Sequence, residues 1–288
     1  MTSHEISPLR YPGGKGGLAP FLGRLLSSQS RPCRVYVEPY AGGAGVALRL
    51  LCDEYVDEVV LNDLDAGVAA FWRSVFRRTE ELAQLIEHAQ VTVDAWHAQR
   101  AIYTSRGGQL DDLELGFATF FLNRTNRSGI LNARPIGGLG QTGPWKIDAR
   151  YNGTRLAERV RTLGHYRNRV TVCEEDGLAI ASRFLTDDHF IYADPPYLVR
   201  GSDLYLDTLT WSDHQQLAKK LTASTGRWMV TYDHDPRVHE LYPHERRAEF
   251  VIAHTAAKPH VGRELAVFAD ALQVADLAGL GRDGRFVS

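Results

Sequence analysis

The sequence has few cysteines and no long apolar run. Its three cysteines, Cys33, Cys52 and Cys173, are odd in number and widely spaced. This matches neither a disulfide framework nor the paired spacing of a zinc site, so we expect a protein of the reducing cytoplasm with no metal ion. The first residues lack the cationic start and apolar stretch of a signal peptide, and no apolar run reaches membrane-spanning length. We therefore expect a protein that is neither secreted nor embedded in a membrane.

The chain also lacks a linker, an internal repeat and a strong net charge. No Pro/Ser/Gly-rich or low-complexity stretch divides its 288 residues, so one large domain with an insertion fits better than two separate domains. The 44% hydrophobic and 24% charged content is ordinary for a folded protein with a sizeable core. Because the formal net charge is only −2, any nucleic-acid surface has to come from a local separation of charge.

Short apolar or β-branched runs recur along the chain, and several are followed by a turn signal and a helical pattern. This alternation predicts an α/β fold with a doubly wound, mostly parallel sheet. The last two strands lack a convincing helix between them, which indicates an antiparallel pair at the sheet edge. The predicted strands are Arg34–Glu38, Glu58–Leu61, Val170–Cys173, Phe190–Ala193, Trp228–Thr231, Glu249–Ala253 and Ala266–Ala269. The predicted helices are Gly45–Asp53, Ala66–Arg77, Asp176–Phe184 and Asp213–Thr222, the last with Ser212 as its candidate cap.

The alternation of strands and helices is interrupted between about Ala66 and Tyr166. Apolar spacing from Thr79 to Phe121 suits two or three amphipathic helices. A long glycine-rich loop follows, and a loop of that length inside a compact domain usually has a function. We therefore expect a main domain of residues 1–65 and 166–288 and an inserted, mostly helical subdomain of residues 66–165.

Positive charge is concentrated in the segment Leu122–Val170. It holds ten Lys or Arg residues and two acids, a net charge of +8 in a protein of net −2. A solvated basic face is the simplest interpretation. Trp145, Tyr151 and Tyr166 lie among these charges as candidate stacking surfaces, which favours contact with a nucleic acid.

Glycines cluster in Val37–Gly45, between a predicted strand and a predicted helix. Glycine there permits a tight turn and the close approach of a ligand to the backbone. Dinucleotide, nucleotide and S-adenosylmethionine sites share such turns, and a purely structural turn is the alternative. The next strand ends in Leu61–Asp65, where Asp63 or Asp65 suits hydrogen bonding to a ribose diol, although either could instead cap the following helix. The turn and the acid together indicate an adenosine-containing cofactor.

The most specific motif is Asp194-Pro195-Pro196-Tyr197, which ends the apolar strand that starts at Phe190. Proline fixes φ and has no N–H donor, which leaves carbonyl oxygens free to accept hydrogen bonds. The carboxylate and an adjacent carbonyl can hold both hydrogens of an aromatic amine, aim its lone pair at an electrophile and stabilise the positive charge that develops there. The aromatic ring that follows can stack on the base. A strand that simply ends in a Pro-Pro turn is the alternative.

Four motifs in order resemble those of Dam-type (alpha-group) DNA adenine-N6 methyltransferases, and the likeness runs from about Leu9 to Ala269. The motifs are Arg10–Lys15 at the N-terminus, Glu38–Gly45 as the cofactor loop, Asn62–Asp63 as the ribose-binding acid and Asp194–Tyr197 as the catalytic tetrapeptide. The resemblance implies a Rossmann-like methyltransferase domain that transfers a methyl group from S-adenosylmethionine to a flipped-out adenine of double-stranded DNA, without a metal. It also implies that the insertion is the target-recognition subdomain.

The resemblance assigns roles to individual residues. Asp194, Pro195, Pro196 and Tyr197 would be catalytic, and the cofactor would be bound by Tyr11, Lys15, Glu38, Tyr40, Gly42, Gly45, Asp63 and Asp176. DNA would be contacted by Asn123, Arg124 and Thr125, with Arg127 and Arg134 of the basic segment. Asp176 matches the acid that approaches the cofactor's adenine amino group. Gly177 stands where the family often has an aromatic residue, so stacking on that adenine is expected to come from elsewhere.

Other features depart from the family or leave alternatives open. Asn132–Gly138 replaces the hairpin sequence that well-known members carry after Gly129, so we do not assume that the recognised sequence is GATC. Tyr232–Arg237 and His260–Glu264 resemble family signatures near the pocket mouth, although surface turns would explain each alone.

Three rival functions follow from the same motifs. An RNA adenine methyltransferase shares the chemistry, and a catalytically silent DNA-binding protein is a less favoured alternative. A protein-glutamine methyltransferase is disfavoured because that class usually carries Asn where this chain has Asp194. We expect a monomer or weak dimer, and a separately encoded restriction enzyme is a candidate partner.

Overall fold

The computed structural model describes residues 6–11, 13–105, 111–196, 209–254 and 260–287. Its strands are β1 (Val35–Glu38), β2 (Glu58–Asn62), β3 (Val170–Cys173), β4 (His189–Ala193), β5 (Arg227–Asp233), β6 (Arg246–His254), β7 (His260–Phe268) and β8 (Arg282–Val287). The α-helices are α1 (Ala19–Ser27), α2 (Gly45–Cys52), α3 (Ala66–Arg77), α4 (Thr79–His88), α5 (Val93–Thr104), α6 (Asp112–Thr125), α7 (Gly153–Gly164), α8 (Gly177–Phe184), α10 (Trp211–Thr222) and α11 (Arg237–Leu241). Short 3-10 helices are η1 (Gly16–Leu18), η2 (Arg127–Gly129) and η3 (Arg167–Arg169).

These strands form one eight-stranded sheet in the order β3-β2-β1-β4-β5-β7-β6-β8. The five strands from β3 to β5 run parallel, whereas β7 pairs antiparallel with both β5 and β6, and β8 pairs antiparallel with β6. The predicted α/β fold, with a doubly wound sheet and an antiparallel edge, is confirmed. β7 lies between β5 and β6, so the last strands enter the sheet out of chain order.

Several observed elements were not predicted, namely α1, α7, α11 and β8, and the predicted cap of α10 was wrong. β8 was not predicted because its sequence, Arg282–Val287, is polar and exposed, and backbone pairing with β6 rather than an apolar pattern makes it a strand. The cap of α10 is Thr210 instead of Ser212. The Thr210 side chain accepts from the Asp213 backbone, and the Asp213 carboxylate accepts from the Thr210 backbone, so the two residues form a capping box.

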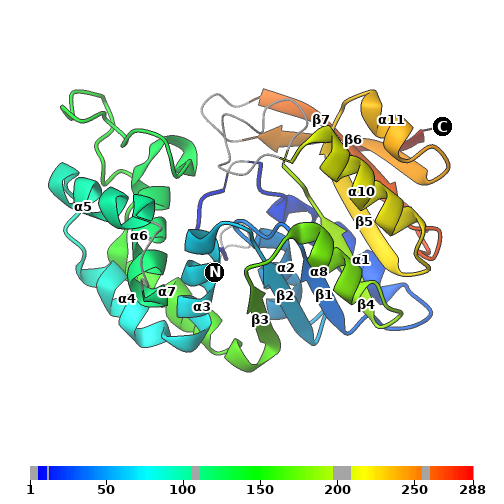
Figure 1. Ribbon diagram of the computed structural model, residues 1–288, viewed down its shortest axis with the longest axis horizontal. Helices are drawn as coiled ribbons and strands as arrows, with labels where there is room; N and C mark the ends of the chain where they lie inside the picture. The colour runs from blue at the N-terminus through cyan, green and yellow to red at the C-terminus, as the bar shows by residue number, and fades with distance from the viewer. Residues whose placement is uncertain (1–5, 12, 106–110, 197–208, 255–259, 288) are drawn as a thin grey trace.

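Helices cover both faces of the sheet (Figure 1). Connections between parallel strands are right-handed, so the direction of each step along the sheet decides the face on which its helix lies. The chain steps from β1 to β2 and on to β3 in one direction, which places α2 and α3 on one face. It then steps from β3 to β4 and on to β5 in the other direction, which places α8 and α10 on the opposite face. Among the helices described, none has both the length and the apolar character needed to cross a bilayer.

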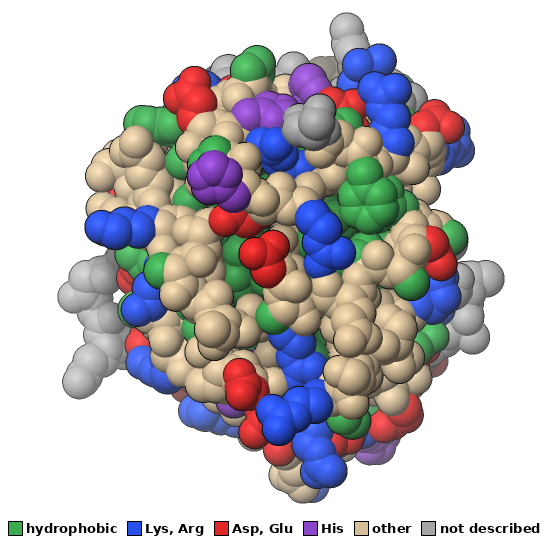
Figure 2. All heavy atoms as spheres, turned by 90° about the vertical axis from the view of Figure 1, so that its right-hand side faces the viewer, with side chains coloured by type: hydrophobic (Ala, Val, Ile, Leu, Met, Phe, Trp, Pro, Cys, Tyr) green, Lys and Arg blue, Asp and Glu red, His purple; other side chains and the backbone are tan. Residues whose placement is uncertain are grey.

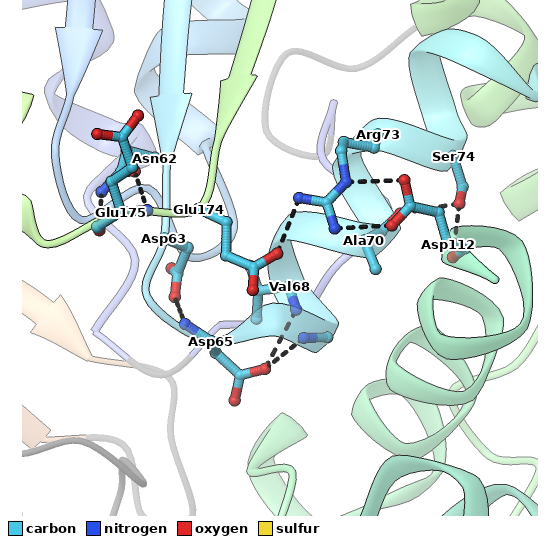
Figure 3. Close-up of polar contacts among 11 residues, drawn as sticks. Asn62, Asp63, Asp65, Val68, Ala70, Arg73, Ser74, Asp112, Glu174 and Glu175 are labelled. Atoms are coloured by element: carbon cyan, nitrogen blue, oxygen red, sulfur yellow. Dashed lines mark hydrogen bonds and ion pairs between the residues drawn. The ribbon is translucent and has the colours of Figure 1, made fainter. Parts of the chain in front are cut away.

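The inserted helices α4, α5, α6 and α7 gather to one side of the sheet (Figure 1). Helix α3 connects them to it, because α3 packs against both β3 and α6. Arg73 on α3 forms ion pairs with Asp112 at the start of α6, at 2.7 Å, and with Glu174 after β3, at 2.9 Å (Figure 3). Side chains of α3, α4 and α7 share the apolar core of the sheet, while Trp96 and Phe121 belong to a second cluster between α5 and α6. The main core thus continues across residue 66, and the division into two domains stays a prediction.

Candidate active site

A cavity of about 900 Å³ opens at the carboxyl ends of β1, β2 and β4. The strand order reverses beside β1, and ligands of doubly wound sheets bind at such a switch point. All the residues predicted to bind a cofactor and two of the predicted catalytic residues line this cavity: Tyr11, Lys15, Glu38, Tyr40, Gly42, Gly45, Asp63, Asp176, Asp194 and Pro196. Pro195 is buried, and Tyr197 lies outside the described residues.

The loop between β1 and α2 contains two residues in the left-handed region, Gly42 and Ala44. Gly42 has a φ of +46°, and a Cβ at this position would come within 2.6 Å of the Tyr11 ring. Ala44, directly before α2, has a φ of 48°. The indole nitrogen of Trp72 donates to the Gly42 carbonyl at 2.9 Å and anchors the loop from α3. The loop is therefore anchored from α3, and its glycines line the cavity.

The two acids after β2 have different positions (Figure 3). Asp65 caps α3 by accepting from the backbone of Gly67 and Val68, and it also accepts from the Tyr103 hydroxyl at 2.7 Å. Asp63 accepts from the Gly42 backbone at 2.8 Å through Oδ2 and from the Asp65 backbone at 3.0 Å through Oδ1. Asp65 is thus the capping acid, whereas Asp63 connects the glycine loop to the end of β2.

Asp176 and Tyr40 lie on the same side of the cavity. Asp176 caps α8 by accepting from the Ala179 backbone at 3.0 Å, so its carboxylate is fixed at the start of that helix. A Cβ at Gly177 would overlap the Tyr40 ring. Gly177 therefore makes room for an aromatic ring that comes from the end of β1. The Tyr40 ring thus occupies the position next to Asp176 where the family often has an aromatic side chain at residue 177.

Glu38 is a buried acid at the end of β1. Its Oε1 accepts from the Tyr36 hydroxyl at 3.1 Å and from the Ala47 backbone at 3.0 Å, close to the start of α2. Burial raises the pKa of Glu38 to about 8, against the lowering effect of these two hydrogen bonds, and nearby Asp194 adds to the rise. The carboxyl therefore changes its charge near neutral pH.

Asp194 follows β4 and reaches the cavity with part of its side chain. Its Oδ1 lies 2.7 Å from the Thr231 hydroxyl and 3.2 Å from the Lys15 ammonium. Burial raises the pKa of the Asp194 carboxyl, Lys15 opposes that rise and Glu264 adds to it. Thr231 in turn lies 2.9 Å from the Tyr192 hydroxyl. The acid is thus held by two residues that come from outside its own strand.

Two residues of this centre were not assigned to the site from the sequence. Glu264 on β7 is buried, with its Oε2 3.4 Å from the Lys15 ammonium, and Thr231 is buried on β5. The segment His260–Glu264 was noted only as a signature near the pocket, and a single threonine in an apolar strand gives no signal of its own. The pairing of β5 with β7 brings both residues to the end of β4.

A family model described as D12 class N6 adenine-specific DNA methyltransferase matches residues 11–255. The match spans more than half of the chain and contains the whole glycine loop and Asp194. The chain belongs to this family. The resemblance drawn from the four sequence motifs is thereby confirmed.

Individual proteins that resemble this chain share only a small part of its sequence. The modification methylase StsI of Streptococcus sanguinis is 25% identical over 204 residues, which cover 67% of this chain and 29% of that protein. The chain thus spans less than a third of that relative's length. Among solved structures, the rRNA methyltransferase aviRa of Streptomyces viridochromogenes is 14% identical with a TM-score of 0.38, covering 94% of this chain and 93% of that one. A candidate RNA methyltransferase of Pyrococcus horikoshii is 11% identical with a TM-score of 0.41, covering 91% and 88%.

Two predicted DNA contacts of this family member lie inside the fold. The Asn123 side chain accepts from the Arg10 backbone at 2.7 Å and donates to the carbonyls of Arg10 and Gly129 at 2.9 Å each. Thr125 is buried and donates to the Phe121 carbonyl at 2.7 Å. Both side chains use their polar groups within the protein, so in the described structure they position the loop and do not present a surface to DNA.

The three predicted arginines lie at or near the surface. Arg124 lines the cavity and donates to the carbonyl of Arg150 at 2.9 Å. Arg127 and Arg134 are exposed, and their backbones are joined by a 3.1 Å hydrogen bond where the chain folds back on itself. The loop after them presents Trp145 with 69% of its surface exposed. The insertion therefore exposes two cations and an aromatic ring.

Proposed function

We propose that this protein is a DNA adenine-N6 methyltransferase that uses S-adenosylmethionine as its methyl donor. The observation that supports this best is that Asp194 and the glycine loop with Asp63 line one cavity, although they come from opposite sides of the strand reversal. A methyl transfer needs its donor and its acceptor within reach of each other. Family membership supports the same reaction.

The residues around the cavity fit S-adenosylmethionine. The volume of about 900 Å³ is in the range of sites for ligands of this size. Asp63 at the end of β2 stands where an acid suits a ribose diol, and Asp176 stands where an acid suits an adenine amino group. Gly42 makes room for the Tyr11 ring at the cavity, because a Cβ there would come within 2.6 Å of that ring. When bound, S-adenosylmethionine supplies an electrophilic methyl group.

Asp194 and the Pro195 carbonyl would hold the target amine by accepting its two hydrogens. This aims the nitrogen lone pair into the cavity and stabilises the positive charge that develops on the nitrogen. The adenine has to leave the duplex, because its N6 cannot otherwise reach a cavity at the end of a buried sheet. We propose the same stacking role for Tyr197 as the sequence predicts.

Double-stranded DNA is the proposed substrate. The exposed cations Arg127 and Arg134, and the wider segment Leu122–Val170 with its net charge of +8, suit contacts to phosphates. Trp145 adds an exposed ring within the same segment. The opposite end of the molecule, near β6, β8 and α11, shows cationic, anionic and histidine side chains interspersed instead (Figure 2). We therefore place the DNA on the side of the insertion.

The test is methyl transfer by the Asp194→Ala variant. We expect turnover on duplex DNA to fall by roughly 100-fold or more, because one preorganised charge-stabilising group is lost at the amine. S-adenosylmethionine binding, measured by equilibrium dialysis, should be largely retained. Asp188→Asn, at an exposed acid, is the matched control and should keep its turnover. Near-normal methylation by Asp194→Ala would refute the assignment of this residue.

The choice of nucleic acid is tested in the same assay. Methyl incorporation into duplex DNA and into structured RNA should be compared at equal concentrations, with N6-methyladenine as the measured product. Preference for RNA would favour the alternative substrate with the same chemistry. No cofactor binding by the wild-type chain would favour a catalytically silent DNA-binding protein.

A further inference from the structure

A buried ion cluster lies behind Asp194. Lys15 and Glu264 have side chains that are only 2% and 1% exposed, whereas the Asp194 side chain is 23% exposed and reaches the cavity. The Lys15 ammonium is 3.2 Å from Asp194 Oδ1, 3.4 Å from Glu264 Oε2 and 3.3 Å from the Gly13 carbonyl. The ammonium donates a hydrogen bond to the Gly13 carbonyl and lies within ion-pair distance of both carboxylates. Lys15 is thus shared between two acids, and only one of them faces the cavity.

The contacts of Asp194 are not divided evenly between its two oxygens. Lys15 and Thr231 both contact Oδ1, at 3.2 Å and 2.7 Å. Because an ionised carboxylate only accepts, the Thr231 hydroxyl has to use its single hydrogen on Oδ1. The Tyr192 hydroxyl, 2.9 Å away, then donates to Thr231. The hydrogen bonds therefore run from Tyr192 to Thr231 to Asp194, and they fix the orientation of the Asp194 carboxylate.

Resting on the proposed function, we propose that Glu264 and Thr231 are positioning residues for methyl transfer. Together with Lys15 they hold Asp194 by Oδ1, so that Oδ2 accepts the hydrogen of the target amine. Glu264 has a second effect, because its charge competes for Lys15. If Lys15 paired with Asp194 alone, the carboxylate would be more fully neutralised and would stabilise the positive charge of the reacting nitrogen less.

The sheet makes this arrangement rigid. Glu264 lies opposite Asp233 in the antiparallel pairing of β5 with β7, two residues from Thr231. Thr231 therefore lies on β5, next to β4, and Glu264 lies on β7, next to β5, so neither positioning residue lies on a surface loop. A shift of about 1 Å in a reacting group can cost on the order of 100-fold in rate, which is the reason such support matters.

The first test is Glu264→Gln, which keeps the shape and removes the charge. We expect kcat on duplex DNA to fall by roughly 10-fold to 100-fold, while the KM values for DNA and S-adenosylmethionine stay within about twofold. Glu249→Gln on β6, which pairs with His234 and Arg285 at the surface, is the matched control. A structural defect would instead lower the melting temperature and the fraction of active protein, with kcat per active site unchanged.

The pH profile separates an electrostatic role from a structural one. Glu264 raises the pKa of Asp194, so Glu264→Gln should move the acidic limb of kcat to lower pH. Other titratable groups that interact with the same carboxylate are left in place: Lys15, Tyr36 and Glu38 on β1, Tyr192 on β4 and Tyr232 on β5. Asp233 on β5 interacts with Lys15 and Glu264 and is also left in place. An unmoved acidic limb together with a kcat within twofold of the wild type would overturn the proposal.

Thr231 gives a second, independent test that also serves if Glu264→Gln fails to fold. Thr231→Val removes the hydroxyl at nearly constant shape and should lower kcat, whereas Thr231→Ser keeps the donor and should restore most of it. Equal loss in both variants would overturn the orienting role. Methyl transfer by the wild-type chain is measured first. If the wild type transfers no methyl group to duplex DNA, it is the proposed function that fails, and the variants do not then test the positioning role.

Discussion

At the scale of single residues, the site is defined by buried charge. Glu38 and Asp194 line the cavity, and Lys15 lies between Asp194 and the buried Glu264. Burial raises the pKa of Glu38 and of Asp194. A carboxyl with a raised pKa destabilises the folded state when it is ionised. The active centre therefore lowers the stability of the free protein at neutral pH, and a bound ligand with positive charge would relieve this.

Glu38 allows this destabilisation to be measured. Its pKa is about 8 in the folded protein against an ordinary value of 4.5, so the folded state binds the proton more tightly than the unfolded chain. The stabilising effect of the proton is complete below about pH 4.5 and is lost as the pH rises to about 8. We expect the ligand-free wild type to lose stability over that range and Glu38→Gln to lose much less.

The melting temperature is measured between pH 5 and pH 9, at pH values spaced by about one unit. Glu58→Gln, at an exposed glutamate that starts β2, is the control and should follow the wild type. Parallel curves for the wild type and Glu38→Gln would contradict a raised pKa at this position.

At the scale of elements, the conformation of the loop from β1 to α2 depends on the backbone freedom of Gly42. The Gly42→Ala change forces a side chain into a left-handed conformation and against the Tyr11 ring. Left-handed strain of about 1–2 kcal/mol corresponds to roughly 10-fold in affinity. We expect binding of S-adenosylmethionine to weaken by about that factor, as measured by calorimetry.

Gly140→Ala is the matched control for this loop. Its Cβ would meet Thr142 at an ordinary 3.7 Å, and it lies in the glycine-rich segment of the insertion. Cofactor affinity should stay unchanged in this variant. If Gly42→Ala bound the cofactor as tightly as Gly140→Ala, the proposed cofactor role of the loop would be wrong.

At the scale of the whole molecule, positive charge is separated from negative charge: the segment Leu122–Val170 carries +8 in a protein of net −2, so the rest of the chain carries −10. Arg127 and Arg134 stand exposed on the insertion, so the double change to glutamine should remove about two phosphate contacts. The slope of log affinity for duplex DNA against log salt should fall by about 2. Fluorescence anisotropy at several salt concentrations measures it.

The control for this prediction is a pair of arginines on the other side of the molecule. Arg282 and Arg285 lie on β8, far from the insertion, and their replacement by glutamine changes the net charge equally. We expect the salt slope of this variant to match the wild type. Equal slopes in both double variants would mean that net charge, and not the insertion, sets the affinity.

Much of the fold and the site could be predicted from local sequence. The apolar strands with a polar or glycine-rich end, such as the run before Asp194, indicate parallel strands whose carboxyl ends carry function. The glycines of Val37–Gly45 mark a turn, because glycine adopts the left-handed φ of position 42 without strain and leaves room for the Tyr11 ring. The helices and the family motifs are likewise properties of short segments, so the sequence by itself determined the fold class and the family.

Tertiary structure decided the remaining features, since they depend on residues far apart in the chain. Burial of Asn123 and Thr125 could not be read from a polar segment, because their partners lie in another segment or in the preceding helical turn. Residues Arg282–Val287 form the strand β8 because their backbone pairs with β6. The connection of Asp194 to Lys15 and Glu264 depends on the order β4-β5-β7, in which a late strand enters the sheet ahead of an earlier one. Charges buried at such a junction interact strongly because water is excluded, and sequence spacing does not measure that distance.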